Sequence, residues 1–179
     1  MGCDIHFFVE ARGAGGQWES KDKIWKDSTG EFTLLEQFGD REFKMHGNEP
    51  AHKYIDRDYF LFSILADMRN TDPKIPCIAE PRGIPDDISN EVQAVFETWG
   101  ADGHSHSWLL LSEVLDWKQW DHVIEYNDMS WDKAGKVIRK QVTTTLRKRC
   151  QGFWDEALKP MSRLCQDPRH VRMVFCFDN

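Results

Sequence analysis

Both ends of the chain carry the alternation of apolar and polar residues that is typical of a β-strand. Ile5, Phe7 and Val9 alternate with polar residues over positions 4–10, and a similar two-residue period runs from 170 to 179. A strand at a chain end stays ordered when it is docked in a sheet. We therefore expect the two end strands to lie side by side, which constrains the fold more than any other feature.

The residues between the two end strands predict helices and turns. A glycine-rich turn at 12–16, followed by an extended stretch at 17–20, predicts a β-hairpin. Apolar stripes predict one helix over 56–70, a second that begins near 86–89, and a long helical tract over 131–165 that is broken near Gly152 and Pro160. Residues 26–53 show no sustained period, so we interpret them as a long, partly ordered loop.

These elements predict an α+β fold. A small antiparallel or mixed sheet would contain both chain ends, and several helices would pack against it on one face. A chain of 179 residues is long enough for one core and short for two, so we expect a single domain over 1–179.

Charge and cysteine content narrow the classes of partner. The formal net charge of −7 argues against general binding of DNA, which needs a basic face; it is compatible with a basic protein surface, a divalent cation or solubility alone. The five cysteines are odd in number and scattered, without a C-x-x-C pair, so we expect free thiols in a reducing cytoplasm. The sequence shows no apolar run of membrane length, and we expect a cytoplasmic protein without a leader sequence and without membrane contact.

Two polar clusters indicate a candidate metal site. Asp4 and His6 share one face of the first strand, roughly 7 Å apart, and His104 and His106 follow the glycine turn at 100–103. We expect the two clusters to face one pocket.

There, Asp4, His6, His104 and His106 would be ligands of a divalent metal ion, with Glu10 or Asp102 available as a further ligand. Asp4, His104 and His106 would then be catalytic, because a bound metal ion activates water and polarises a phosphoryl oxygen. Two other interpretations stay open. Asp4 would hydrogen-bond backbone groups while the histidines form a capping turn, or one histidine would act without a metal.

Three arginines and a tyrosine are candidates for substrate binding. Arg82 lies between prolines in a stiff turn, which would aim its guanidinium at a phosphate or carboxylate. Arg57, Tyr59 and Arg69 belong to the predicted first helix, where the two arginines lie at opposite ends and need not converge. The alternative for Arg82 is a bond to a helix carboxyl end or to Asp86, and the alternative for Tyr59 is packing in the core.

The basic run at 136–149 is interpreted as a solvated helix face, with an anion or nucleic-acid contact as the alternative. Among the tryptophans, Trp18 and Trp25 are the candidates for a role outside the core.

Short motifs over nearly the whole chain, apart from 26–53 and 117–131, resemble one protein family. They are Met1-Gly2-Cys3-Asp4-Ile5-His6, Arg57-x-Tyr59-x-Leu61-Phe62, Pro81-Arg82-Gly83-Ile84-Pro85, His104-Ser105-x-Ser107 and Val174-Phe175-x-Phe177-Asp178-Asn179. With these motifs the chain resembles a family of small proteins that are carried largely by bacteriophages and prophages. The resemblance implies a phage origin and a place of action inside an infected bacterium, and it implies no reaction.

The residues and this context together suggest three functions. The first is a metal-dependent phosphoesterase that acts on a nucleotide or on a nucleotide signal of host defence. The second is a binding protein that sequesters such a nucleotide without turnover. The third is an acidic protein that inhibits a host defence factor. The residues leave the oligomeric state open.

Overall fold

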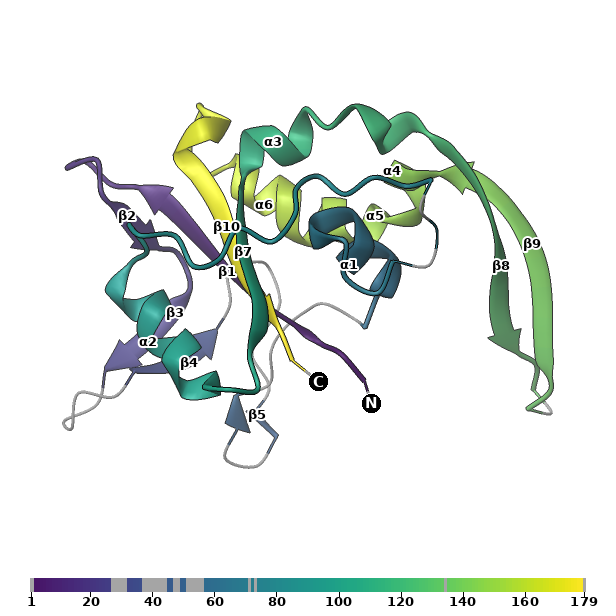
Figure 1. Cartoon of the computed structure of the whole chain (residues 1–179), viewed down its shortest axis with the longest axis horizontal. Coiled ribbons are helices and arrows are strands. Elements are labelled where there is room, and N and C mark those ends of the chain that lie inside the picture. Colours follow the sequence, from purple (N-terminus) through teal and green to yellow (C-terminus); the bar gives the residue numbers. More distant parts are fainter. Residues whose placement is uncertain are drawn as a thin grey trace.

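The computed structural model describes residues 2–26, 32–36, 45–46, 49–50, 57–70, 72, 74–133 and 135–178. Its centre is a four-stranded antiparallel sheet with the order β2-β1-β10-β7 (Figure 1). These strands are β1 (Ile5–Arg12), β2 (Trp18–Ser20), β7 (His104–Leu110) and β10 (Val171–Phe177).

The two end strands form the middle of this sheet. β1 pairs with β10 from Ile5 opposite Phe177 to Ala11 opposite Val171, so the prediction that they lie side by side is confirmed. The predicted β1–β2 hairpin is also confirmed: Gly13 N–H donates to Gln17 O over 2.8 Å. The α+β fold class, with both chain ends in a small sheet packed against helices, is therefore correct.

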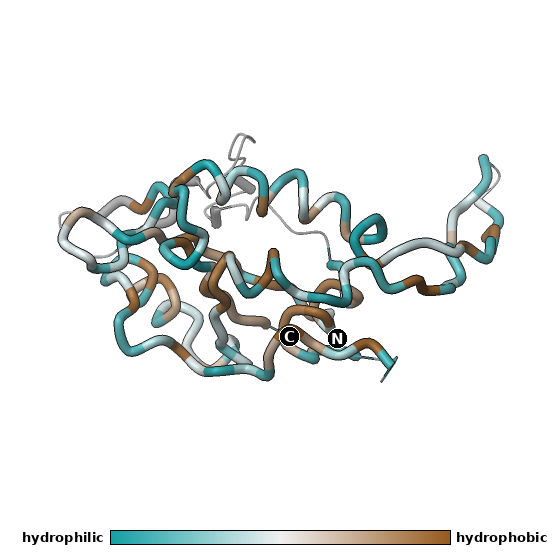
Figure 2. The backbone as a smooth tube through the Cα atoms, turned by 90° about the horizontal axis from the view of Figure 1, so that it is seen from above, coloured by the Kyte–Doolittle hydropathy of each residue, from teal (hydrophilic) through white to brown (hydrophobic). Residues whose placement is uncertain are grey.

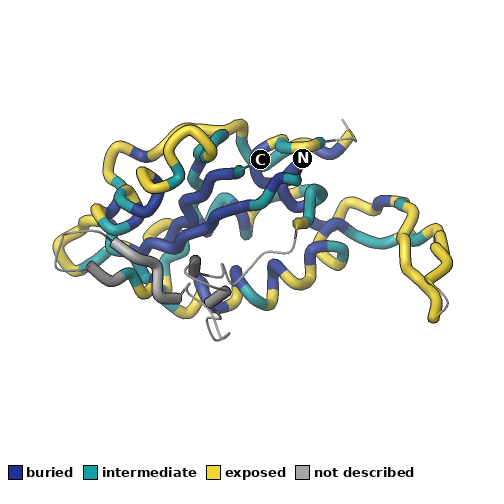
Figure 3. Tube along the Cα trace, turned by 90° about the horizontal axis from the view of Figure 1, so that it is seen from below, coloured by how far each residue is buried: buried dark blue, intermediate teal, exposed yellow. Residues whose placement is uncertain are grey.

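Helices cover both faces of the sheet, whereas the sequence predicted helices on one. The odd-numbered residues of β1 face α1 (Tyr59–Ala66) and the helical run from 146 to 162. Phe8 on the other face packs with Val92 and Phe96 of α2 (Asn90–Trp99). All residues of β10 are buried, as expected of a strand covered on both sides. Figure 2 shows the apolar strands enclosed within the fold, and Figure 3 shows them buried.

The two predicted helices near the centre of the chain are present but shorter than the sequence suggested. Asp58 caps α1 by accepting hydrogen bonds from Phe60 N–H and Leu61 N–H, 3.1 and 3.4 Å long. The helix ends where Asp67 adopts a left-handed conformation with φ of 57°. Ser89 is the N-cap residue of α2, which ends at Gly100.

The prediction of a helical tract over 131–165 is wrong for its first part. Residues 123–145 form the hairpin of β8 (Val123–Trp131) and β9 (Val137–Thr145). The β-branched residues of β9, including Val137, Ile138 and Val142, favour a strand over a helix. Lys136, Arg139 and Lys140 therefore share no helix face with Arg147, Lys148 and Arg149.

The helical part of that tract is a run of short turns. It comprises α4 (Leu146–Arg149), α5 (Gln151–Phe153), a π-helical turn η2 (Trp154–Leu158) and α6 (Lys159–Ser162). The segment 26–53, which was predicted as a loop, contains paired strands. β3 (Lys23–Lys26) pairs with β4 (Phe32–Glu36), and β5 (Met45–His46) pairs with β6 (Glu49–Pro50). The other residues of this segment lie outside the described ones. The remaining elements are α3 (Leu111–Leu115), η1 (Lys118–Asp121) and η3 (Pro168–His170).

Candidate functional site

The predicted residues at the amino end form an ion-paired cluster with the carboxyl end. The guanidinium of Arg57 donates to both carboxylate oxygens of Asp4, at 2.9 and 2.6 Å. Asp4 N–H donates to Asp178 Oδ1 over 2.9 Å, and Asp178 N–H donates to Asp4 O over 3.1 Å. The hydrogen bond and charge of Arg57 hold the pKa of Asp4 below its usual value, although partial burial acts in the opposite direction.

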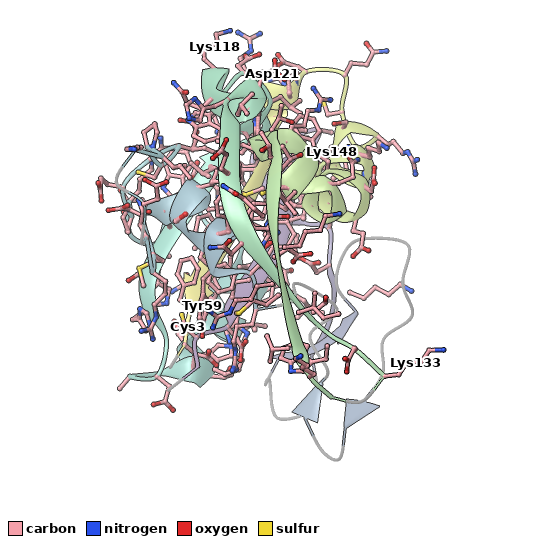
Figure 4. The ribbon with its side chains drawn as sticks, turned by 90° about the vertical axis from the view of Figure 1, so that its right-hand side faces the viewer. Cys3, Tyr59, Lys118, Asp121, Lys133 and Lys148 are labelled. Carbon is pink, nitrogen blue, oxygen red and sulfur yellow. The ribbon has the colours of Figure 1, made fainter. Side chains whose placement is uncertain are left out.

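Tyr59 and Arg69 reach the same end of the molecule. The hydroxyl of Tyr59 accepts a hydrogen bond from Cys3 N–H over 3.2 Å, and Figure 4 shows Tyr59 beside Cys3. The Arg69 guanidinium lies 5.9 Å from the centre of the Tyr59 ring. Arg57 and Arg69 therefore both converge on the first residues of the chain, although the sequence did not require it.

His6 lies between α2 and the carboxyl end. Its ring packs on Trp99 with centroids 3.8 Å apart, and its Nε2 lies 3.1 Å from Asp178 Oδ2. Burial lowers the pKa of His6, and the nearby carboxylates of Asp178 and Asp4 oppose that shift only in part. His6 is therefore held mainly in its neutral form at neutral pH.

His104 and His106 lie on β7 and pack against different neighbours. The His106 ring meets Phe96 edge to face, with centroids 5.2 Å apart, whereas the His104 ring is stacked 6.4 Å from Phe177. Between them, Ser105 has a φ of 50°, which accompanies the register shift opposite β10. Burial, and then the neighbouring His104, lower the pKa of His106.

The four predicted metal ligands therefore lie toward one end of the sheet, but they are engaged in other contacts. The Asp4 carboxylate is bound at both oxygens by Arg57, and His6 lies beside Asp178. In the part of the chain that the structure describes, no group of three or more His, Cys, Asp or Glu side chains is arranged to hold a metal ion. The metal site stays a prediction.

Arg82, the other predicted substrate-binding residue, lies elsewhere. Its guanidinium donates to both carboxylate oxygens of Glu113, at 2.9 and 2.6 Å, and lies 4.9 Å from the centre of the Trp108 ring. The chain around it runs beside β7, where Gly83 N–H donates to His106 O over 2.8 Å. The sequence analysis gave a helix carboxyl end or Asp86 as alternative partners of Arg82; in the structure its partner is Glu113 instead.

Arg82 is part of a hollow of about 810 Å³ that we call the arginine–tryptophan pocket. Its lining combines cationic, aromatic and apolar side chains with two carboxylates. The residues are Arg12, Trp18, Arg82, Ile84, Pro85, Asp86, Asp87, Trp108, Leu110, Arg169 and Arg172. They come from the ends of β1, β2, β7 and β10, from η3 and from the segment before α2.

A buried ion pair fixes the floor of this pocket. Arg172 is 2% exposed and Glu10 is fully buried, and Arg172 Nε donates to Glu10 Oε2 over 2.6 Å. The other carboxylate oxygen of Glu10 accepts from Ser89 N–H over 2.7 Å. Arg172 Nη1 also donates to Asp87 Oδ1 over 2.6 Å. A buried charge needs such partners, because desolvation without them is costly.

Trp18 is clamped between two guanidiniums. Arg12 and Arg172 each lie 4.2 Å from the centre of its ring, and its indole N–H donates to Asp87 Oδ2 over 3.0 Å. Burial acts to raise the pKa of Asp87, but the hydrogen bonds and charges of Arg172, with smaller contributions from Trp18 and Arg12, outweigh it and lower the pKa. Asp87 is thus an ionised acceptor that holds the floor in place.

The outer arginines are tethered and accessible. Arg82 is held by Glu113, and the exposed Arg169 is held by Asp167, whose Oδ2 lies 2.7 Å from Nη2. No hydrogen bond joins Arg82 Nε to another described residue. Carboxylates behind these guanidiniums fix their direction and leave donors for a ligand.

Sequence reasoning found only part of this pocket. Arg82 and Trp18 were candidates, whereas Arg12, Arg169 and Arg172 were not. One signal was available in the sequence: Arg172 stands in an otherwise apolar strand. In the structure, the register of the end strands places Glu10 opposite it. A charged residue within a buried strand implies a buried partner.

No protein-family model, curated protein or solved structure matches this chain. Within the described residues, no helix has the length and apolar character needed to span a membrane.

Proposed function

We propose that the protein binds a nucleotide, or a similar small molecule with an aromatic ring and a phosphate, in the arginine–tryptophan pocket. The observation that carries this proposal is the placement of four arginines and two tryptophans around one hollow of a suitable size. Guanidiniums recognise phosphate through paired N–H groups. Tryptophan and arginine planes provide surfaces on which a base can stack.

The residues divide into an anchor and a contact group. Arg172 is buried and donates from all three of its nitrogens to Glu10 and Asp87, so its role is to hold Trp18 and Asp87 in position. Arg12 and Arg169 lie nearer to solvent and are the candidates for the phosphate contact, together with the tethered Arg82.

Asp86 supplies an acceptor that matches the amino group of a base. It is exposed, lines the same hollow, and makes no hydrogen bond with another described residue. A ligand with both a phosphate and a base edge would therefore meet donors and an acceptor in one place, whereas phosphate alone would meet only the arginines.

Calorimetry with a purine mononucleotide, its nucleoside and inorganic phosphate tests this proposal. We expect saturable one-to-one binding of the nucleotide and weaker binding of either part. Arg169→Gln should weaken binding by roughly tenfold, because a hydrogen bond to a charged group contributes about 1.5–3 kcal/mol. Arg163→Gln, an exposed arginine outside the pocket, is the matched control and should bind normally. Equal binding by the two variants, or none by the native protein, contradicts the proposal.

The fate of the nucleotide separates sequestration from hydrolysis. Recovery of intact nucleotide after heat denaturation supports a binding protein. Conversion that stops with a chelator and in His104→Ala would support the metal-dependent phosphoesterase that the sequence suggested, with Asp4, His6, His104 and His106 as ligands. The phage resemblance makes a nucleotide signal of the host a suitable first ligand for both assays.

A further inference from the structure

The β8–β9 hairpin, residues 123–145, stands away from the body of the molecule as an arm (Figure 1). Figure 3 shows most of its length as exposed. Among the described residues, the large apolar side chains that are exposed lie mostly on this arm; they are Val123, Met129, Trp131, Val137 and Ile138, with Ile84 as the exception. Trp131 is the most exposed of these residues, at 68%. Such a concentration marks a contact surface.

Three of these apolar side chains gather on one face near the tip, whereas Ile138, opposite Ser130, lies on the other face. Trp131 is opposite Val137, and Met129 is opposite Arg139, in the antiparallel register. Residues directly opposite each other, and those two positions along a strand, point to the same side. Met129, Trp131 and Val137 therefore form one apolar face with Arg139 at its edge, and Figure 4 shows Lys133 at the far end of the arm.

The tip and the body of the protein have opposite charge. Residues 131–140 contain four basic side chains and one acidic side chain, which give the tip a formal charge of +3. The formal net charge of the whole chain is −7. The rest of the chain therefore carries −10. Two tips would repel each other, whereas a tip and the body of another copy attract.

The end of the molecule opposite the arm offers a suitable acidic surface. α2 lies toward that end of the longest axis, and the turn after it leads back to the start of β7 (Figure 1). Glu97 and Asp102 are both exposed there, and neither makes an ion pair with a described residue. When two copies lie side by side with their long axes antiparallel, each arm reaches the α2 end of the other.

We propose that the arm is a self-association element: the tip of one copy docks on the α2 end of a second copy, and the reverse contact completes a two-fold symmetric dimer. The apolar face of Met129, Trp131 and Val137 forms the centre of each contact, and the basic side chains of the tip form its rim. A two-fold arrangement satisfies both arms at once and closes the assembly. This proposal is independent of the nucleotide pocket.

Sedimentation equilibrium of the full chain tests the proposal. We expect a dimer, twice the 21.0 kDa of the chain, that dissociates as salt screens the rim charges. Lys136→Glu with Arg139→Glu in the arm, or Glu97→Lys with Asp102→Lys at the α2 end, should each weaken association by about tenfold or more. The control is Lys118→Glu with Lys148→Glu, which makes the same charge change as the arm variant but on exposed residues outside the arm (Figure 4). This control should leave the dimer intact.

Mixing the arm variant with the α2 variant is the decisive measurement. In a mixed dimer the acidic tip of the arm variant meets the basic α2 end of the α2 variant, and the unchanged tip meets the unchanged α2 end. The mixed dimer should therefore be tighter than the dimer of either variant alone. The proposal is overturned if the native chain is monomeric at low salt, if the arm variant dimerises as tightly as the native chain, or if the mixture associates no more tightly than either variant alone. Arm-dependent binding of duplex DNA by a monomer would likewise overturn it, in favour of a nucleic-acid contact.

Discussion

Replacing Glu10 with glutamine should strongly destabilise the protein. In the native chain Glu10 Oε2 accepts from Arg172 Nε over 2.6 Å, and both side chains are buried. The substitution preserves the shape and the acceptor for Ser89 N–H, but it turns an amide NH₂ toward the guanidinium or removes that acceptor. Arg172 then remains buried with only Asp87 as a charged partner.

The expected loss follows from that geometry. Breaking a buried ion pair by removing one partner costs about 3–5 kcal/mol. Because Asp87 still bonds Arg172, we expect the lower end, about 3 kcal/mol, which lowers the melting temperature by roughly 6–12 °C in a chain of this size. Urea unfolding followed by tryptophan fluorescence measures the free energy of unfolding directly.

Two controls isolate the cause. Asp167→Asn breaks an exposed pair with Arg169 and should leave the free energy of unfolding unchanged within error. Glu10→Gln combined with Arg172→Met should lose less than the two single losses added together, because the second change removes the unpaired charge. A loss below about 1 kcal/mol for Glu10→Gln would refute the buried-pair reasoning.

Three further predictions concern titration and thiol reactivity. The pKa of Asp4 is lowered by Arg57, so the stability that this pair adds should be present at neutral pH and disappear as the pH falls below 3.8; urea unfolding of Asp4→Asn and native protein should converge there. Burial lowers the pKa of His6, so stability should fall as the pH drops below 6.5, and NMR titration should place this pKa below that value; a raised pKa would contradict the prediction. Burial raises the pKa of Cys150 and of Cys176 to about 12, so mass spectrometry after alkylation at pH 8 should find both thiols unmodified until the chain unfolds.

The wrong helix over 131–145 shows how local patterns can mislead. Charged residues at spacings of three and four, such as Lys136, Arg139 and Lys140, resemble the solvated face of a helix. In the folded chain, β8 and β9 pair along their whole length, and the β-branched residues of β9 fit that ladder. The sequence contained both signals, and the cross-strand pairing decided between them.

The polar face of the first strand illustrates a second limit. The alternation in β1 indicated a polar face with His6 and Glu10, which the sequence alone placed in one pocket with His104 and His106. In the structure α2 covers that face, so Glu10 pairs with Arg172 inside the protein and His6 packs on Trp99. Burial by a distant segment is not encoded in the strand itself.

The sequence by itself determined the two end strands, the first hairpin and the helices near the centre, because each depends on side chains only a few residues apart. Tertiary structure alone decided the arginine–tryptophan pocket, whose residues Arg12, Arg82, Arg169 and Arg172 come from four segments. Which carboxylate each arginine meets depends on strand register and on how the segments pack, and that is set only when the whole chain folds.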